Sequence, residues 1–255
     1  NKGGLCLNLE EFMNLSEDEA VFYDLKNESP SIKVRKESHP VKKFLLYKLD
    51  YPKTKFDCDS KCQLVKEIYS KLYPQKNLDY LDFDTMNSFY TTYRELLIKE
   101  DKIFWKNNFP PKETDYQKLL SERMDWLLTD NVFQQYASIN NHDEVKRFAT
   151  LTHTIGNMIL LPKGYNKGRI SFSKDYWDLT FLSLREFLGD SFQNYVNDYY
   201  LQDFVEKPIE YWEGHSIKKP LPQSTENVFV FLQTVNKKIE ERGRRIFQEL
   251  KKLFK

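Results

Sequence analysis

One segment breaks an otherwise helical sequence pattern: Thr154-Ile-Gly-Asn-Met-Ile-Leu-Leu-Pro162. Its apolar centre, Asn157-Met-Ile-Leu-Leu161, is too short and too apolar for a surface helix and is typical of a buried strand or turn. Three of the eight glycines of the chain lie close by, within residues 156–168. The pattern predicts a small β element near residues 150–172.

The rest of the chain favours helices. Its 255 residues include only 8 Gly and 10 Pro, and long polar side chains are common. We expect Asp84 to cap a helix, and we predict a last helix over residues 224–254. The short segment Ser31–Lys36 instead alternates in the manner of a strand.

These patterns predict a mainly α (α+β) fold, a helical domain with one small β element. Residues 1–255 are expected to form a single domain, with an N-terminal helical subregion over 1–110 and a distinct module over 140–205. The chain begins Asn1-Lys-Gly-Gly4 rather than with Met, so we expect it to be a fragment or a trimmed form of a longer protein.

Charge and hydropathy narrow the classes of function. The chain has 39 Lys and Arg against 38 Asp and Glu, a formal net charge of +1, which argues against a protein whose whole surface grips nucleic acid. No apolar run of about 18 residues occurs, so we predict no transmembrane helix and no membrane partner. The last twenty residues hold eight Lys or Arg against three Glu. Such a run either contacts phosphate or an acidic partner, or is a solvated helix face.

Cysteine usage indicates the compartment. The chain has three cysteines, Cys6, Cys58 and Cys62, an odd number and too few for a disulfide framework. We therefore predict a reducing cytoplasm. Cys58 and Cys62 are spaced C-x3-C without a second Cys or His pair nearby, so two thiols on one helical turn are favoured over a zinc site.

The loop around the β element carries the candidate chemistry. His153 could polarise a water or bind a metal, and Asn166 could orient that imidazole. Lys163, Lys167 and Arg169 form a cationic rim suited to phosphate. In the alternative interpretation, Asn and Gly only make turns here and His153 hydrogen-bonds a backbone carbonyl.

The string His153-Thr-Ile-Gly-Asn-Met-Ile-Leu-Leu161, followed by Tyr165-Asn166, resembles the H-T-[IL]-G-N-[LM]-x-L-[LT]…[YL]-N signature of the HNH-derived domain in GmrSD-type modification-dependent restriction enzymes. That domain belongs to the ββα-metal nucleases. The resemblance implies a metal-dependent nuclease in which His153 and Asn166 hold one divalent metal, Mg²⁺ or Zn²⁺, and an upstream His of an E-H-I-x-P motif acts as general base.

The sequence departs from that family in two places. No E-H-I-x-P motif precedes the loop, and the second Asn of the family falls at Ser171. His142, in His142-Asp-Glu144, would replace the missing base if it faced Asn166. The alternative is that this triplet is the acidic first turn of a helix.

A second resemblance covers residues 150–205. Segments 154–162, 175–180 and 192–205 are similar to a bacterial family to which no activity is assigned. This resemblance implies a shared fold, and it suggests that Thr154-Ile-Gly-Asn-Met158 is a structural turn kept where catalysis is absent.

Two functional hypotheses follow. The first is a degenerate HNH-like module in a bacterial or phage protein of a defence or counter-defence system, acting on nucleic acid. If such a protein is an enzyme, it is a metal-dependent HNH-like nuclease. The second is a non-catalytic protein that binds another protein or a small ligand through this loop and nearby aromatic side chains. The oligomeric state follows from neither.

Overall fold

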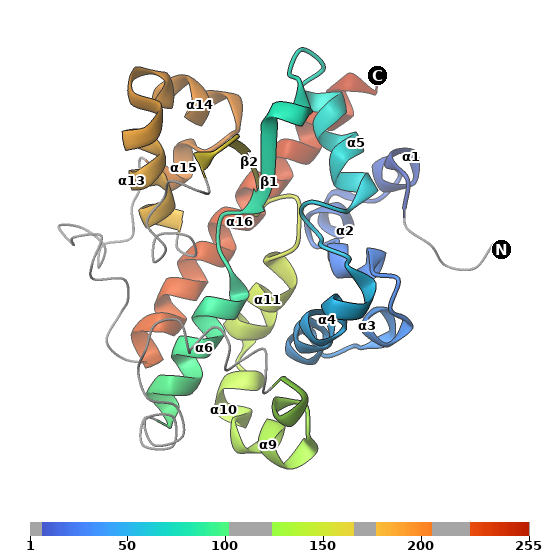
Figure 1. The fold of residues 1–255 in the computed structure, drawn as a ribbon, viewed down its shortest axis with the longest axis vertical. Helices are drawn as coiled ribbons and strands as arrows, with labels where there is room; N and C mark the ends of the chain where they lie inside the picture. The colour runs from blue at the N-terminus through green and yellow to red at the C-terminus, as the bar shows by residue number, and fades with distance from the viewer. Residues whose placement is uncertain (1–6, 102–123, 166–176, 206–224, 255) are drawn as a thin grey trace.

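The computed structural model describes residues 7–101, 124–165, 177–205 and 225–254 (Figure 1). In chain order the α-helices, short 3-10 helices (η) and strands are α1 (Leu9–Met13), α2 (Glu17–Val21), η1 (Leu25–Glu28), α3 (Ile32–Lys36), α4 (Pro40–Thr54), α5 (Gln63–Leu72), η2 (Leu78–Tyr80), β1 (Leu81–Thr85), α6 (Phe89–Glu100), α9 (Asp130–Gln135), α10 (Ala137–Asn140), α11 (Asp143–Leu151), β2 (Met158–Pro162), α13 (Trp177–Leu188), η4 (Gly189–Ser191), α14 (Phe192–Asp198), α15 (Gln202–Val205) and α16 (Thr225–Leu253).

The described residues are mainly helical, and their single sheet has two strands. The prediction of a mainly α fold with a small β element is therefore confirmed. Buried apolar side chains from α1 through α16 form one hydrophobic cluster. Within the described residues, no helix is both long and apolar enough to cross a membrane.

Helix α16 is the longest element and the one around which the others pack. Its 29 residues extend about 43 Å at 1.5 Å per residue, and it runs the length of the molecule in Figure 1. Helices α2, α5, α6 and α11 all contact it. Its buried apolar side chains recur at three- and four-residue steps: Val228, Phe231, Leu232, Val235, Ile239, Ile246, Phe247 and Leu250. The helix predicted over residues 224–254 is confirmed.

The turn before β2 crosses α16 with no side chain between the two backbones. A methyl group on Gly156 would lie 2.0 Å from the carbonyl oxygen of Ile239, and one on Gly243 would lie 3.5 Å from Cα of Gly156. No rotamer change can relieve a clash with a helix carbonyl. Glycine at position 156 is thus required by the close approach of two backbones.

Arg242 stabilises the same crossing of the turn over α16. It is 2% exposed, and its Nη1 donates to the carbonyl oxygens of Gly156 at 2.8 Å and Met158 at 2.6 Å. Its Nε donates to the carbonyl oxygen of Tyr199 at 3.1 Å. Carbonyl dipoles therefore compensate the buried guanidinium and join α16 to the turn and to the end of α14.

The sheet pairs β2 with β1, a strand that the sequence pattern did not predict. β1 and β2 are antiparallel, with Leu81 opposite Pro162 and Thr85 opposite Met158. The prediction that Asp84 caps a helix is wrong, because Asp84 lies in β1 and α6 begins at Phe89 after Ser88. The period-two pattern of β1 is only five residues long, and its partner lies far away in the chain, so the helical pattern that follows dominated the prediction.

Side chains, rather than a third strand, complete the outer edge of β2. The Tyr195 hydroxyl donates to the carbonyl oxygen of Leu160 at 2.5 Å. The Tyr69 hydroxyl donates to that of Met158 at 2.9 Å. These carbonyls are thereby satisfied, so the edge of β2 offers little to a further strand.

A second prediction, a strand over residues 31–36, is wrong. The segment is not a strand: Ile32–Lys36 form helix α3, which packs on α4. Of its two apolar side chains, Val34 is fully buried and Ile32 is 58% exposed. A five-residue strand without a neighbouring strand leaves its backbone groups unpaired, whereas a helical turn pairs them locally, as in the bond from Glu37 N–H to Lys33 O at 3.1 Å.

The crossing at Gly156 generates a stability prediction. Gly156→Ala is expected to reduce the free energy of unfolding by about 3 kcal/mol or more, because the new methyl group meets the α16 backbone. Urea unfolding followed by tryptophan fluorescence measures the change.

Gly164→Ala is the matched control. Gly164 has φ +90 and no atom within 4 Å of an added methyl group, so only the backbone conformation is penalised, by about 1 kcal/mol. Equal losses in the two variants would contradict the steric explanation for Gly156.

Candidate functional site

His153 lies directly after helix α11, inside the molecule. The residue is 6% exposed. The imidazole stacks on the Phe44 ring, with ring centroids 5.9 Å apart and an angle of 18° between the planes, and meets the Tyr47 ring edge-on at 5.0 Å. Two aromatic side chains of α4 thus cover the imidazole.

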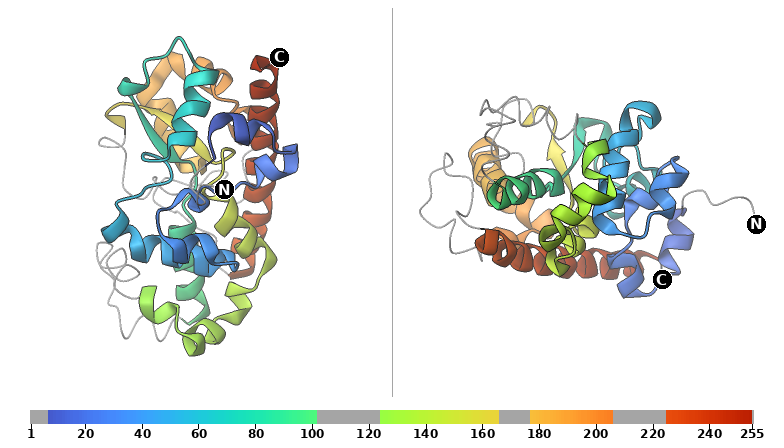
Figure 2. Two further views of the ribbon diagram at one scale, coloured as in Figure 1. Left: turned by 90° about the vertical axis from the view of Figure 1, so that its right-hand side faces the viewer. Right: turned by 90° about the horizontal axis from the view of Figure 1, so that it is seen from below.

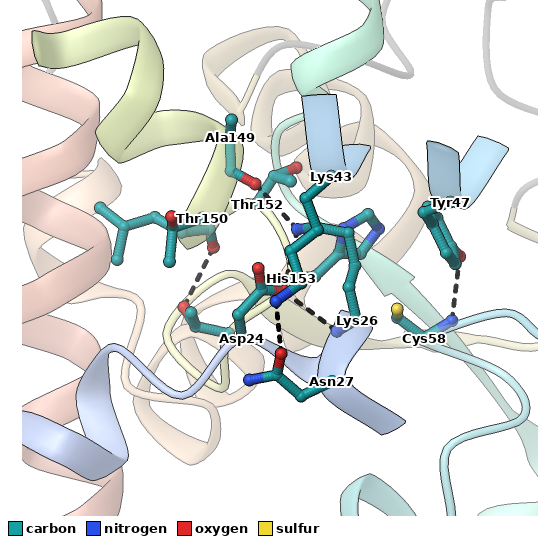
Figure 3. A network of polar contacts seen from close by, with 12 residues as sticks. Asp24, Lys26, Asn27, Lys43, Tyr47, Cys58, Ala149, Thr150, Thr152 and His153 are labelled. Atoms are coloured by element: carbon teal, nitrogen blue, oxygen red, sulfur yellow. Dashed lines mark hydrogen bonds and ion pairs between the residues drawn. The ribbon is translucent and has the colours of Figure 1, made fainter. Parts of the chain in front are cut away.

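A buried lysine approaches the imidazole (Figure 3). Nζ of Lys26 lies 3.4 Å from Nδ1 of His153 and donates to the carbonyl oxygen of Ala149 at 2.8 Å. It also forms an ion pair with Asp24 at 2.9 Å, and its side chain has no exposed surface. Because an ammonium group can only donate, Nδ1 is the acceptor and carries no proton.

These neighbours hold the pKa of His153 well below its usual range. Burial is the largest cause, since it disfavours the imidazolium form, and the positive charges of Lys26 and Lys48 act in the same direction. The imidazole is therefore neutral near pH 7. The main-chain carbonyl of His153 accepts from Leu25 N–H at 2.8 Å. Both the side chain and the backbone of His153 therefore contact the region around η1.

The side chain of Asn157 also has a structural role. It has no exposed surface, and its Nδ2 donates to the carbonyl oxygens of Asn87 at 2.8 Å and Thr152 at 2.9 Å. Its Oδ1 accepts from Asn87 N–H at 3.2 Å. Both ends of the carboxamide are used to join the loop before β2 to the segment between β1 and α6.

His142 is a helix cap in this structure. Its Nδ1 accepts from Glu144 N–H at 3.2 Å, at the start of α11. The ring stacks on Phe229 of α16, with centroids 3.8 Å apart and planes 10° apart. Asp143 pairs with Lys146 at 2.9 Å. The interpretation of His142-Asp-Glu144 as the acidic first turn of a helix is therefore confirmed.

Of the three residues predicted to form a cationic rim, the structure describes only Lys163. Lys163 is exposed, and its Nζ donates to the carbonyl oxygen of Asp79 at 3.1 Å and lies 5.5 Å from the Tyr80 ring centroid. Lys167 and Arg169 lie outside the described residues, as does Asn166. Whether Asn166 approaches His142 or His153 therefore stays a prediction.

The described residues do not fit a divalent metal at His153. A metal ligand needs a free lone pair in a region of negative charge, whereas Nδ1 faces an ammonium group and the ring is buried. Cys58 and Cys62 are buried free thiols. Burial raises the pKa of both, to about 11 for Cys62. Among the residues that the structure describes, no group of three His, Cys, Asp or Glu is placed to hold a metal ion.

The most unusual pair of side chains near this loop is not predicted by the sequence pattern. Asp24 and Lys26 are buried, at 7% and 0% exposure, although they lie in an ordinary polar stretch. No periodic signal marks them, because the residues that bury them, such as Ala149 and His153, come from the other half of the chain.

Comparisons of the whole chain with protein-family models, with curated proteins and with solved structures found no match.

The environment of His153 predicts a pH dependence of stability. The pKa of His153 is below its value near 6.5 in the unfolded chain, so as the pH falls the unfolded state binds the proton first. The stability contributed by the neutral imidazole is complete above about pH 6.5 and is lost below it, by up to about 1.4 kcal/mol per pH unit until the folded-state pKa is reached.

Unfolding free energies of the wild type and His153→Gln, measured from pH 8 to pH 5, check this prediction. The wild type should lose stability more steeply than the variant below pH 6.5, because glutamine does not titrate. Parallel curves for the two proteins would show that His153 titrates normally in the folded state.

Proposed function

We propose that this chain is a binding protein without metal-dependent nuclease activity, in which the HNH-like segment His153–Met158 serves as a structural turn. The observation that carries the proposal is the position of His153. Its Nδ1 faces the Lys26 ammonium group at 3.4 Å, and the residue is only 6% exposed.

A catalytic role would need a different environment. A general base must reach a water or substrate proton with its lone pair, and a metal ligand must direct that lone pair at a cation. At His153, Nδ1 is engaged by Lys26. Freeing it would require Lys26 to leave Asp24 and the Ala149 carbonyl inside the core, which would leave buried charges unpaired.

The neighbouring residues of the motif support the same proposal. Gly156 is required by the crossing with α16, and the Asn157 carboxamide bonds three backbone groups. Each of these residues has a structural role that fully explains its chemical type. The segment is thus suited to holding β2 against α16.

The proposal is tested by a nuclease assay on the whole chain. Plasmid DNA and RNA are incubated with the protein and Mg²⁺, Mn²⁺ or Zn²⁺, alongside His153→Gln, His142→Gln and Asn166→Ala variants. We expect no cleavage by the wild type above the background of the three variants. Thermal unfolding with and without each metal should show the same midpoint.

Metal-dependent cleavage that is present in the wild type and lost in His153→Gln would overturn the proposal in favour of the HNH-like nuclease. A variant on another surface, Lys71→Gln, is the matched control for preparation-dependent contamination, and its background should equal that of the wild type.

A further inference from the structure

Positive charge is concentrated in the segment that forms α3 and α4. Residues 31–56, which include α3 and α4, contain eight Lys or Arg against two acidic residues, in a chain whose net charge is +1. Both acidic side chains have local hydrogen-bond partners. Glu37 accepts from His39 N–H at 2.8 Å, and Asp50 accepts from the Ser31 hydroxyl.

Helices α3 and α4 form an antiparallel pair at the surface of the molecule. The hydrogen bond from Ser31 to Asp50 places the start of α3 beside the end of α4. Figures 1 and 2 show the pair on one side of the molecule. One face of α4 is buried in the core through Val41, Phe44, Leu45 and Tyr47.

Four of the eight cations are used inside the protein. Lys42 pairs with Asp130 at 3.5 Å, and Lys43 donates to the Asn27 carboxamide. Lys48 lies over the Tyr47 ring at 5.3 Å, and Arg35 donates to the carbonyl oxygen of Ser29 at 2.6 Å.

The other four cations, Lys33, Lys36, Lys53 and Lys55, are exposed. Within the described part of the chain none of them has an acidic group within 4.0 Å. We call these four lysines, together with Ile32 and Tyr51, the α3–α4 surface.

Helix α16, the other basic segment, differs in this respect. Arg244 pairs with Asp18 at 2.6 Å and with Glu17 at 3.2 Å, and Arg245 pairs with Asp203 at 2.9 Å. Arg242 is buried, and Lys252 pairs with Glu249 at 2.6 Å. Acidic side chains thus pair with Arg244, Arg245 and Lys252 of α16, whereas within the described residues none pairs with the four lysines of the α3–α4 surface.

Two exposed apolar side chains lie on the same helices, Ile32 on α3 and Tyr51 on α4. Ile32 is 58% exposed and Tyr51 is 41% exposed. Cations that follow a phosphate backbone, next to an aromatic ring on which a base can stack, are the arrangement that binds single-stranded nucleic acid. A lipid surface fits less well, because a membrane-bound helix needs a wide apolar face and the apolar face of α4 is in the core.

We propose that the α3–α4 surface binds single-stranded nucleic acid, with Lys33, Lys36, Lys53 and Lys55 contacting phosphates and Tyr51 stacking on a base. The inference specifies the partner of the binding role proposed above and rests on it. Contacts to about four phosphates of a single strand give a slope near −3 for log K against log salt concentration.

The test is a fluorescence-anisotropy titration of labelled 20-nucleotide single-stranded DNA and RNA with the full chain, in EDTA and about 50 mM salt. The fourfold variant Lys33→Gln, Lys36→Gln, Lys53→Gln and Lys55→Gln should bind at least about tenfold more weakly than the wild type. The control variant Lys61→Gln, Lys71→Gln, Lys237→Gln and Lys252→Gln has the same net charge and should bind within about twofold of the wild type.

Tyr51→Ala tests the stacking contact. It should weaken single-strand binding about fivefold or more and leave binding to a duplex of the same length unchanged. Circular dichroism and thermal unfolding confirm that each variant is folded.

Three outcomes would overturn the inference: no binding of single strands by the wild type, equal weakening in the two fourfold variants, or stronger binding to phosphatidylserine vesicles than to the oligonucleotides. Because EDTA removes divalent metals, binding is measured separately from cleavage. A failure here and a failure of the nuclease prediction are therefore distinguishable.

Discussion

The contact on which the rest of the structure depends is the crossing of the turn at Gly156 over helix α16. Two backbones meet there without intervening side chains, and Arg242 bonds the carbonyl groups of the turn from the helix. The crossing sets the position of β2, and β2 in turn positions β1 and the tyrosines that complete the sheet. A helix of 29 residues can organise a chain of this length because helices from both halves pack along it.

The packed structure also sets the surroundings of His153. In the segment after α11, the imidazole of His153 lies against two aromatic rings, and its Nδ1 faces the buried ammonium group of Lys26. Whether a side chain can act in catalysis depends on its access to substrate and solvent and on the charges around it. Both are properties of the packed structure, and a short sequence motif does not contain them.

Which positive charges are paired also depends on the tertiary structure. The basic run at the end of the chain is conspicuous in the sequence, but α2 and α15 supply carboxylates that pair with it. The lysines of α3 and α4 are less conspicuous, because they are spaced over a longer segment with apolar residues between them. Only the fold separates Lys42 and Lys48, which face protein groups, from Lys33 and Lys53, which face solvent. Whether a lysine is paired with a carboxylate therefore depends on which residues the fold places next to it.

The sequence by itself determined the elements whose signals are local. The three- and four-residue spacing in α16 and the apolar run of β2 reflect burial on one face of a single element, so both could be predicted. Tertiary structure alone decided the strand β1, the helix at residues 32–36, the buried Asp24–Lys26 pair and the enclosure of His153. Each depends on partners far away in the chain, and short segments take the conformation that those partners stabilise.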